Sequence, residues 1–183
     1  MPPSTPHRGS TTLRSGPATG IVIRPAHTQD VRAIRALVTP YAEGRVLLQK
    51  EAVAYYESVR DFVVADDAGS LVGCGGLHVL WEDLAEIRTL AVAADHLGRG
   101  VGSAILTELL RQADQIGVRR IFCLTFETDF FGRHGFEPIE GRAVTAEVYA
   151  ELLRSYDEGV AEFLDLERVK PNTLGNTRML RRL

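Results

Sequence analysis

Glycine alternates with other residues in the segment HLGRGVGSAIL, residues 96–106, which contains Gly98, Gly100 and Gly102. The spaced apolar residues that follow predict an amphipathic helix over 103–117. Because glycine in a helix costs roughly 1 kcal/mol relative to alanine, the glycines oppose helix formation at this place. Two interpretations explain them. One is a tight turn, and the other is a cradle in which the missing side chains let backbone N–H groups reach a phosphate.

Two nucleotide-binding motifs with glycine-rich loops do not fit this segment. The Walker A loop ends in Gly-Lys-Ser/Thr, whereas Gly102 is followed directly by Ser103. The dinucleotide fingerprint needs a further glycine where Ser103 or Ile105 stands. The strands predicted before the loop also form a hairpin rather than opening a βαβ unit. The phosphate interpretation therefore needs a different family of loops.

The run Leu-Ala-Val at 90–92, followed by Gly-Arg-Gly-Val-Gly and a helix, resembles the pyrophosphate loop of the GNAT N-acetyltransferases. The resemblance implies that backbone amides bind the pyrophosphate of acetyl-CoA and that the pantetheine arm lies along the strand before the loop. The usual first residue of the loop is Gln or Arg, and Leu97 replaces it here, which leaves the backbone cradle intact. The implied coenzyme residues are Leu90, Ala91, Val92, Gly98, Arg99, Gly100, Val101, Gly102 and Ser103.

Three further stretches resemble the acetyltransferase domain of the N-acetylglutamate synthases. They are LHVLWEDLAEIRTLAV at 77–92, LTFETDFFGRHGF at 124–136 and the terminal NTRML at 176–180. The resemblance implies an amino-acid N-acetyltransferase that acetylates glutamate in the first step of arginine biosynthesis. The larger synthases also carry a kinase domain, for which this chain has no room, so a short single-domain version is expected.

Acetylation of an amine needs a proton acceptor and a donor to the thioester carbonyl. Glu86 matches the usual base position of the family, and its alternative role is a solvated carboxylate paired with Arg88. The carbonyl oxygen is assigned to the backbone N–H of Leu90 or Val92. Phe131 occupies the position of the tyrosine that protonates the leaving thiolate in many relatives. Phe131 is therefore assigned to the pantetheine wall, and Thr128 or Thr125 to positioning a water.

Glutamate has two carboxylates, so its pocket needs fixed cations. The resemblance implies Lys50, Arg88, Thr177 and Arg178, while an exposed salt bridge is the alternative for each cation. The synthases usually read Arg-x-Ser-Lys at the end, where this chain has Gly175-Asn176-Thr177-Arg178. One carboxylate contact is thereby lost, which leaves room for glutamine. The acidic residues Glu82, Asp83 and Glu86 instead favour a cationic substrate such as a polyamine or a protein amine. A non-catalytic acyl-CoA-binding regulator is the third possibility.

The elements that must position these residues follow from periodicity and turn signals. Glycines at 73, 75 and 76 indicate a bulge or a close backbone approach. The order predicts a mixed α/β domain, and the resemblance implies a GNAT fold with a mostly antiparallel sheet and flanking helices. Strands are predicted at 21–26, 62–67, 71–80, 84–95, 119–126 and 176–180, and helices at 31–44, 51–59, 103–117, 128–135 and 145–159.

Composition restricts the class of protein. The 183 residues carry a net charge of −3, which argues against an electrostatic nucleic-acid binder. No apolar run is long enough to span a bilayer. Cys74 and Cys123 lie in apolar runs without metal-ligand spacing, which predicts buried reduced thiols, no metal site and a cytoplasmic location. Residues 1–20 are predicted to be a disordered leader and 21–183 the domain. A homodimer is left open.

Overall fold

The computed structural model describes residues 20–47, 50–166 and 175–183; the predicted leader, apart from Gly20, lies outside these ranges. The strands are β1 (Ile21–Pro25), β2 (Phe62–Asp67), β3 (Ser70–Trp81), β4 (Leu84–Val92), β5 (Arg120–Thr125), β6 (Glu137–Pro138) and β7 (Thr177–Arg182). The helices are α1 (Val31–Glu43), α2 (Ala52–Glu57), α3 (Val101–Gln115), α4 (Thr128–Arg133), α5 (Ala146–Leu152) and α6 (Glu158–Phe163). Short 3-10 turns lie at Thr28–Asp30, Val59–Asp61 and Ala94–His96.

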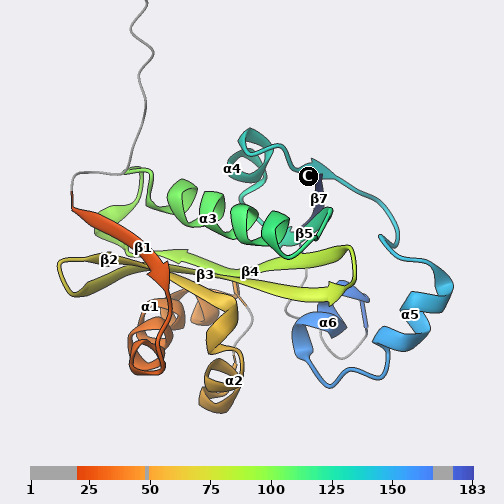
Figure 1. Cartoon of the computed structure of the whole chain (residues 1–183), viewed down its shortest axis with the longest axis horizontal. Coiled ribbons are helices and arrows are strands. Elements are labelled where there is room, and N and C mark those ends of the chain that lie inside the picture. The colour runs from red at the N-terminus through yellow and green to blue at the C-terminus, as the bar shows by residue number, and fades with distance from the viewer. Residues whose placement is uncertain (1–19, 48–49, 167–174) are drawn as a thin grey trace, which may run out of the picture.

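All these strands form one sheet in the order β1-β2-β3-β4-β5-β7-β6. Neighbouring strands run antiparallel except β4 and β5, which run parallel. Helices α3 and α4 cover one face, and α1, α2, α5 and α6 lie on the other (Figure 1). The mixed α/β prediction with a mostly antiparallel sheet is therefore confirmed.

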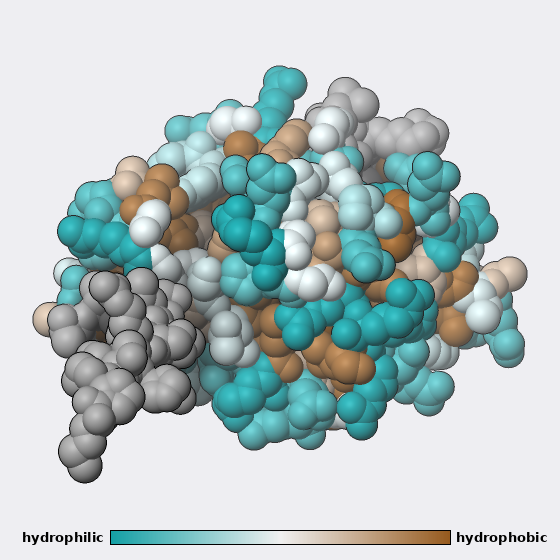
Figure 2. Space-filling view, turned by 90° about the horizontal axis from the view of Figure 1, so that it is seen from above, coloured by the Kyte–Doolittle hydropathy of each residue, from teal (hydrophilic) through white to brown (hydrophobic). Residues whose placement is uncertain are grey.

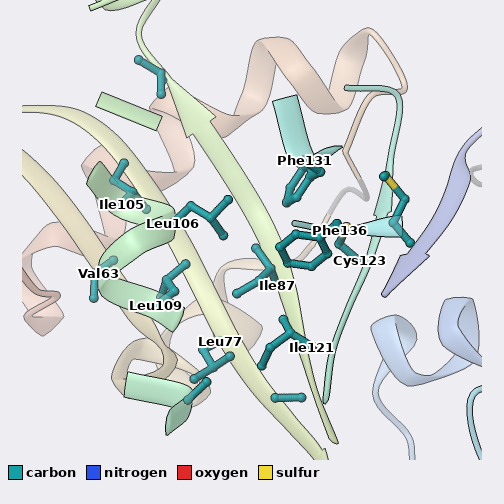
Figure 3. Packing of buried hydrophobic residues seen from close by; sticks show 14 of the residues in the cluster. Val63, Leu77, Ile87, Ile105, Leu106, Leu109, Ile121, Cys123, Phe131 and Phe136 are labelled. Atoms are coloured by element: carbon teal, nitrogen blue, oxygen red, sulfur yellow. The ribbon is translucent and has the colours of Figure 1, made fainter. Parts of the chain in front are cut away.

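The main core lies between α3 and the sheet. Leu106 and Leu109 of α3 face Ile87 of β4, and Phe131 and Phe136 close the α4 end of the same cluster (Figure 3). These side chains are buried, so their apolar area supplies the main drive for docking α3 on the sheet. The outer face of α3 belongs to the surface in Figure 2, where hydrophobic residues form small patches between hydrophilic ones.

Two glycines of β3 let α3 approach the sheet closely. A Cβ at Gly73 would lie 2.7 Å from Ile105 Cδ1, and one at Gly75 would lie 2.8 Å from Ile105 Cγ2. Side chains at these positions would push the helix away from the strand. The predicted close approach and bulge are both confirmed, because the β3–β4 register also shifts between Cys74 and Gly76.

The opposite face has two smaller clusters. The cluster under α1 contains Cys74, and Cys123 lies in the main core, so both thiols are buried and free as predicted. The cluster under α5 and α6 includes Phe122 and Phe163, whose rings meet edge to face at 4.9 Å. Within the described residues, no helix is long and apolar enough to cross a membrane.

The prediction of one helix over 145–159 is wrong. The chain forms α5, then breaks, and restarts as α6 at Glu158. Thr145 caps α5 as expected, because its side chain accepts a hydrogen bond from Val148 N. The Asp157 side chain accepts one from Val160 N and so begins a second helix, and this competing cap interrupts the periodic pattern. The strand predicted over 84–95 also ends earlier, at Val92.

Candidate active site

The glycine loop forms a turn that leads directly into α3. Gly98 has φ +73° and Gly100 has φ +81°, a left-handed conformation that favours glycine. Gly100 is the N-cap of α3, and the first helical bond runs from Ala104 N to Gly100 O at 3.0 Å. The amides of residues 101–103 precede that bond, so they are the first-turn donors that a helix leaves without helical partners. A Cβ at Gly98 or Gly100 would meet no atom within 4 Å, so the space above both is open.

A cleft, here called the loop cleft, opens beside this turn. Its floor is the end of β4, and its far wall comes from α4. Its lining residues are Tyr41, Leu90, Ala91, Val92, His96, Leu97, Gly98, Gly100, Val101, Gly102, Ser103, Glu127, Phe130 and Arg133. Every residue assigned to the coenzyme lines it except Arg99 and Phe131. Positive potential at the N-terminus of α3 and the open amides make the cleft suited to a phosphate.

A bulge in β4 separates that strand from β5. Two β4 residues, Thr89 and Leu90, stand between the pairs that Arg88 and Ala91 form with β3, and Thr89 has φ +58°. Pairing between β4 and β5 covers only Leu84 to Glu86 on β4. The two parallel strands therefore diverge after Glu86, and a pocket forms between them.

This second hollow, here called the charged pocket, collects ionisable groups from distant parts of the chain. Lys50 precedes α2, Glu86 and Arg88 lie on β4, and Glu162 lies on α6. Leu90, Glu127 and Phe130 line both the charged pocket and the loop cleft, so the two hollows adjoin at these residues. An amine in one and an acyl carrier in the other would meet there.

Arg88 links two carboxylates. Its Nε and Nη2 donate to Glu86 Oε2 at 3.1 and 2.7 Å, and its Nη1 donates to both oxygens of Asp157 at 2.9 and 3.1 Å. Glu86 is 2% exposed. The alternative role of Glu86 was a solvated carboxylate paired with Arg88. The pairing is present, but the carboxylate is buried rather than solvated.

Burial shifts the pKa of two other groups in the charged pocket. Burial, and then the nearby Arg88 charge, lower the pKa of the Lys50 ammonium. Burial, and then Glu86, raise the pKa of the Glu162 carboxyl to about 7, although Lys50 and Arg88 oppose that shift. Both changes follow from desolvation, which penalises the charged form of either group.

The structure places the predicted substrate residues unequally. Lys50 and Arg88 line the charged pocket, but Thr177 and Arg178 do not. The Arg178 Nη2 donates to the Phe163 carbonyl at 2.7 Å, and its guanidinium lies over the Phe122 ring at 4.9 Å. Arg178 thus ties β7 to α6, and its role in substrate binding stays a prediction.

The predicted catalytic threonine, Thr128, begins α4 and lines neither hollow, whereas Thr125 lines the charged pocket and accepts a hydrogen bond from Glu127 N at 2.8 Å. Phe131 lines the charged pocket, and its ring meets those of Phe130 and Phe136 edge to face, each at 5.2 Å. The neighbouring Phe130 is the phenylalanine that reaches both hollows.

Sequence reasoning missed Asp157, Gly159 and Glu162, because one helix was predicted over 145–159, without a break before Asp157, and no helix was predicted beyond it. The available signal was the Ser-x-Asp pattern at 155–157, a common start of a helix. It also missed Tyr41, whose hydroxyl donates to the Val92 carbonyl at 2.6 Å in the loop cleft.

The turn at the N-terminus of α3 leaves backbone amides open, and the adjoining pocket contains a buried carboxylate. This arrangement fits the transfer of a group from a phosphate-bearing carrier to an acceptor that gives up a proton. The chain belongs to the acetyltransferase (GNAT) family, whose pattern matches residues 30–136. This match confirms the resemblance and the fold class drawn from the glycine loop.

A relative and a crystal structure from Mycobacterium tuberculosis match most of this chain. The amino-acid acetyltransferase of Mycobacterium tuberculosis is 57% identical over 162 residues, which are 87% of this chain and 92% of that protein. A crystal structure from the same organism, in complex with CoA and NLQ, is 57% identical with a TM-score of 0.86, over 88% of this chain and 99% of that one.

A larger synthase has a similar domain. The N-acetylglutamate synthase of Neisseria gonorrhoeae, complexed with coenzyme A and N-acetyl-glutamate, has a TM-score of 0.72 at 24% identity. The alignment covers 91% of this chain but 36% of that one, and it shows the likeness of fold alone.

Proposed function

We propose that this protein is an amino-acid N-acetyltransferase that moves the acetyl group of acetyl-CoA to the α-amine of glutamate or glutamine, the first step of arginine biosynthesis. The observation that carries the proposal is the charged pocket, which joins the loop cleft at Leu90, Glu127 and Phe130. The relationship to the amino-acid acetyltransferase of Mycobacterium tuberculosis supports an amino acid as the acetyl acceptor.

The loop cleft suits acetyl-CoA. The amides at the start of α3 would hold its pyrophosphate, and β4 from Leu90 to Val92 would lie beside its pantetheine arm. Leu97 supplies no charge, but His96 and Arg133 also line the cleft and bring cationic or titratable side chains to it. The Leu90 or Val92 N–H remains the predicted donor to the thioester oxygen.

Glu86 is the proposed proton acceptor on the central strand. It is buried within the charged pocket, and Arg88 holds one of its oxygens in place. A fixed carboxylate can take a proton from the attacking amine as the C–N bond forms. Thr128 as the group that positions a water, and coenzyme A leaving as thiolate, remain parts of the proposal.

Lys50 is the proposed contact for a substrate carboxylate. It lies in the charged pocket, and no residue in the described ranges forms an ion pair with it. Arg88 is already bonded to Glu86 and Asp157, so it has less capacity for a second substrate carboxylate. This distribution supports acceptance of glutamine alongside glutamate.

The acidic cluster favours a polyamine or protein substrate less than the sequence indicated. Asp83 pairs with Arg120 at 2.8 Å, outside the charged pocket, and Glu82 does not line that pocket either. Glu86 is neutralised by Arg88. The polyamine, protein-amine and regulator alternatives stay open to the test below. A homodimer and a cytoplasmic location stay predictions.

A thiol-release assay tests the proposal. Acetyl-CoA is offered with each of the twenty amino acids and with spermidine, and coenzyme A production is followed. We expect glutamate and glutamine to give the highest kcat/KM. Faster turnover of spermidine or of a peptide amine would assign the second alternative, and binding of acetyl-CoA without turnover would assign the regulator.

A further inference from the structure

The first turn of helix α6 contacts the central strand at Arg88. The guanidinium bonds to Asp157, whose Oδ1 also accepts a hydrogen bond from Val160 N at 2.9 Å. A Cβ at Gly159 would lie 2.7 Å from Arg88 Cζ. Two features therefore position the first turn of α6 on Arg88: the ion pair with Asp157 and the absence of a side chain at Gly159.

Glu162 follows Gly159 by three residues, so both lie on the same side of α6. Because Gly159 contacts Arg88, that side faces β4. Glu162 lines the charged pocket together with Lys50, Glu86 and Arg88, and it is half-buried there. The position of Glu162 in the pocket is thus fixed by the same contacts that dock α6.

The charges of the pocket divide into paired and unpaired groups. Arg88, Glu86 and Asp157 are joined to one another. Lys50 and Glu162 form no salt bridge with any residue of the described ranges. Glu127 also lines the pocket without a salt bridge, but it is exposed, whereas Lys50 and Glu162 are half-buried. Lys50 and Glu162 thus offer one group of each sign inside the pocket, which is the complement of an α-amino acid with its ammonium and carboxylate.

We infer that Glu162 contacts the substrate ammonium and accepts the first of the two protons that the amine loses. The inference rests on the proposed function and assigns to α6 a part in the chemistry. Lys50 would hold a carboxylate of the same substrate, and Glu86 would serve the second proton.

The protons balance as follows. The substrate enters as R–NH₃⁺; one N–H bond breaks, its electron pair stays on nitrogen, and the proton joins the Glu162 carboxylate. The neutral amine then attacks the thioester carbonyl, a C–N bond forms, and the C–S bond breaks to release the thiolate. The second proton leaves nitrogen for Glu86, which passes it to the thiolate, and Glu162 returns the first proton to solvent.

The ionisation of Glu162 suits this role. Burial, and then the repulsion of Glu86, raise its pKa to about 7, and the charged groups around the pocket are Lys50, Glu86, Arg88, Asp157 and Glu127. A proton acceptor works best when its pKa lies near the working pH. Below pH 7 the carboxyl is protonated and cannot take the ammonium proton, so the rate should rise as pH increases through about 7.

The test is the pH profile of kcat/KM for the amino acid in Glu162→Gln. We expect about a 10²-fold loss at neutral pH, the usual size for one proton acceptor, and recovery at high pH as the free amine forms by itself. The break near pH 7 should disappear, and kcat/KM should instead rise continuously toward the pKa of the substrate ammonium. The matched control is Glu147→Gln, an exposed carboxylate of α5 outside the charged pocket, which should keep the wild-type profile.

A wild-type profile in Glu162→Gln would overturn the inference and leave the proposed function standing. Acetyl-CoA binding by calorimetry checks that the variant is folded. If it is not, Glu162→Asp keeps the carboxylate; a retained but shifted rise supports the role, and an unchanged profile opposes it. If wild-type protein uses spermidine and no amino acid, the proposed function fails, and the same variants measured with spermidine still decide the role of Glu162.

Discussion

The loop cleft and the charged pocket adjoin, yet they are built in different ways. The open backbone amides of the loop cleft come from one continuous segment, the glycine turn and the first turn of α3. The charged pocket takes its groups from four separate places: Lys50, β4, the loop before α4 and α6. A backbone site of this kind depends on conformation, whereas the pocket depends on side chains brought together by packing. Substitutions should therefore act differently on the two hollows.

Glu86→Gln should have the largest effect and should act on the charged pocket alone. Removing a proton acceptor typically lowers the rate by about 10²- to 10⁴-fold. Affinity for acetyl-CoA, measured by calorimetry, should be unchanged. Glu82→Gln is the matched control, because Glu82 is exposed and lies outside both hollows. A near-wild-type rate for Glu86→Gln at neutral pH would remove Glu86 from the chemistry.

Gly100→Glu should act on the loop cleft and weaken the binding of acetyl-CoA. A side chain there strains a left-handed residue and puts a negative charge beside the first-turn amides, so acetyl-CoA affinity should fall by about 10²-fold or more. Gly117→Glu is the control. Gly117 also has a left-handed φ of +87° with open space around it, but it lies just beyond the opposite end of α3. Equal affinities in the two variants would contradict a phosphate cradle.

Lys50→Ala tests whether Lys50 contacts a substrate carboxylate in the charged pocket. Losing one partner of a buried charge pair typically costs about 2–5 kcal/mol, so KM for glutamate should rise by roughly 30-fold or more. KM for acetyl-CoA should barely change, which serves as the internal control. Lys50→Arg should retain most of the affinity because the charge remains. Unchanged amino-acid kinetics in the alanine variant would exclude Lys50 from the substrate.

Gly159→Ala tests whether α6 belongs to the charged pocket. The new Cβ would lie 2.7 Å from the Arg88 guanidinium, and overpacking of this kind costs about 1–3 kcal/mol. We expect a lower unfolding temperature and a lower rate, because Arg88 holds Glu86. Gly132→Ala adds the same methyl group to α4 with nothing within 4 Å, and it should be neutral or slightly stabilising.

The smallest effect concerns stability and pH. The pKa of Glu162 is raised to about 7 in the folded protein, so the folded state holds more protons than the unfolded state between about pH 4.5 and 7. Stability therefore decreases as pH rises through that window. The unfolding temperature of Glu162→Gln minus that of the wild type should therefore be larger at pH 8 than at pH 5. An equal difference at both pH values would contradict a buried, weakly paired carboxyl.

The sequence was sufficient for the glycine turn of the loop cleft because the signal of that turn is local. Gly98 and Gly100 cannot be exchanged without strain, and their spacing before α3 is visible in a single short segment. The strands and the hairpin were equally visible, since alternation and turn residues act over a few positions. The resemblance also identified, from sequence alone, Leu97 and Phe131 as departures from the usual loop and tyrosine pattern of the family.

The charged pocket was predictable only in part. Lys50, Glu86 and Arg88 were identified from resemblance, but nothing in the sequence showed that Arg88 would be bonded to Asp157 across 69 positions. The apolar periodicity of 145–159 predicted one helix, and the Asp157 cap divided it. As a result, α6 and Glu162 were missing from the predicted site.

The family, the mixed sheet and the glycine turn could be predicted from the sequence, because each depends on patterns within short segments. Which charges share a pocket depends instead on tertiary packing. The bulge at Thr89 separates β4 from β5, and the packing of α6 on Arg88 brings Glu162 to that opening. Burial then changes the pKa of Lys50 and Glu162, and burial is a property of the folded chain alone.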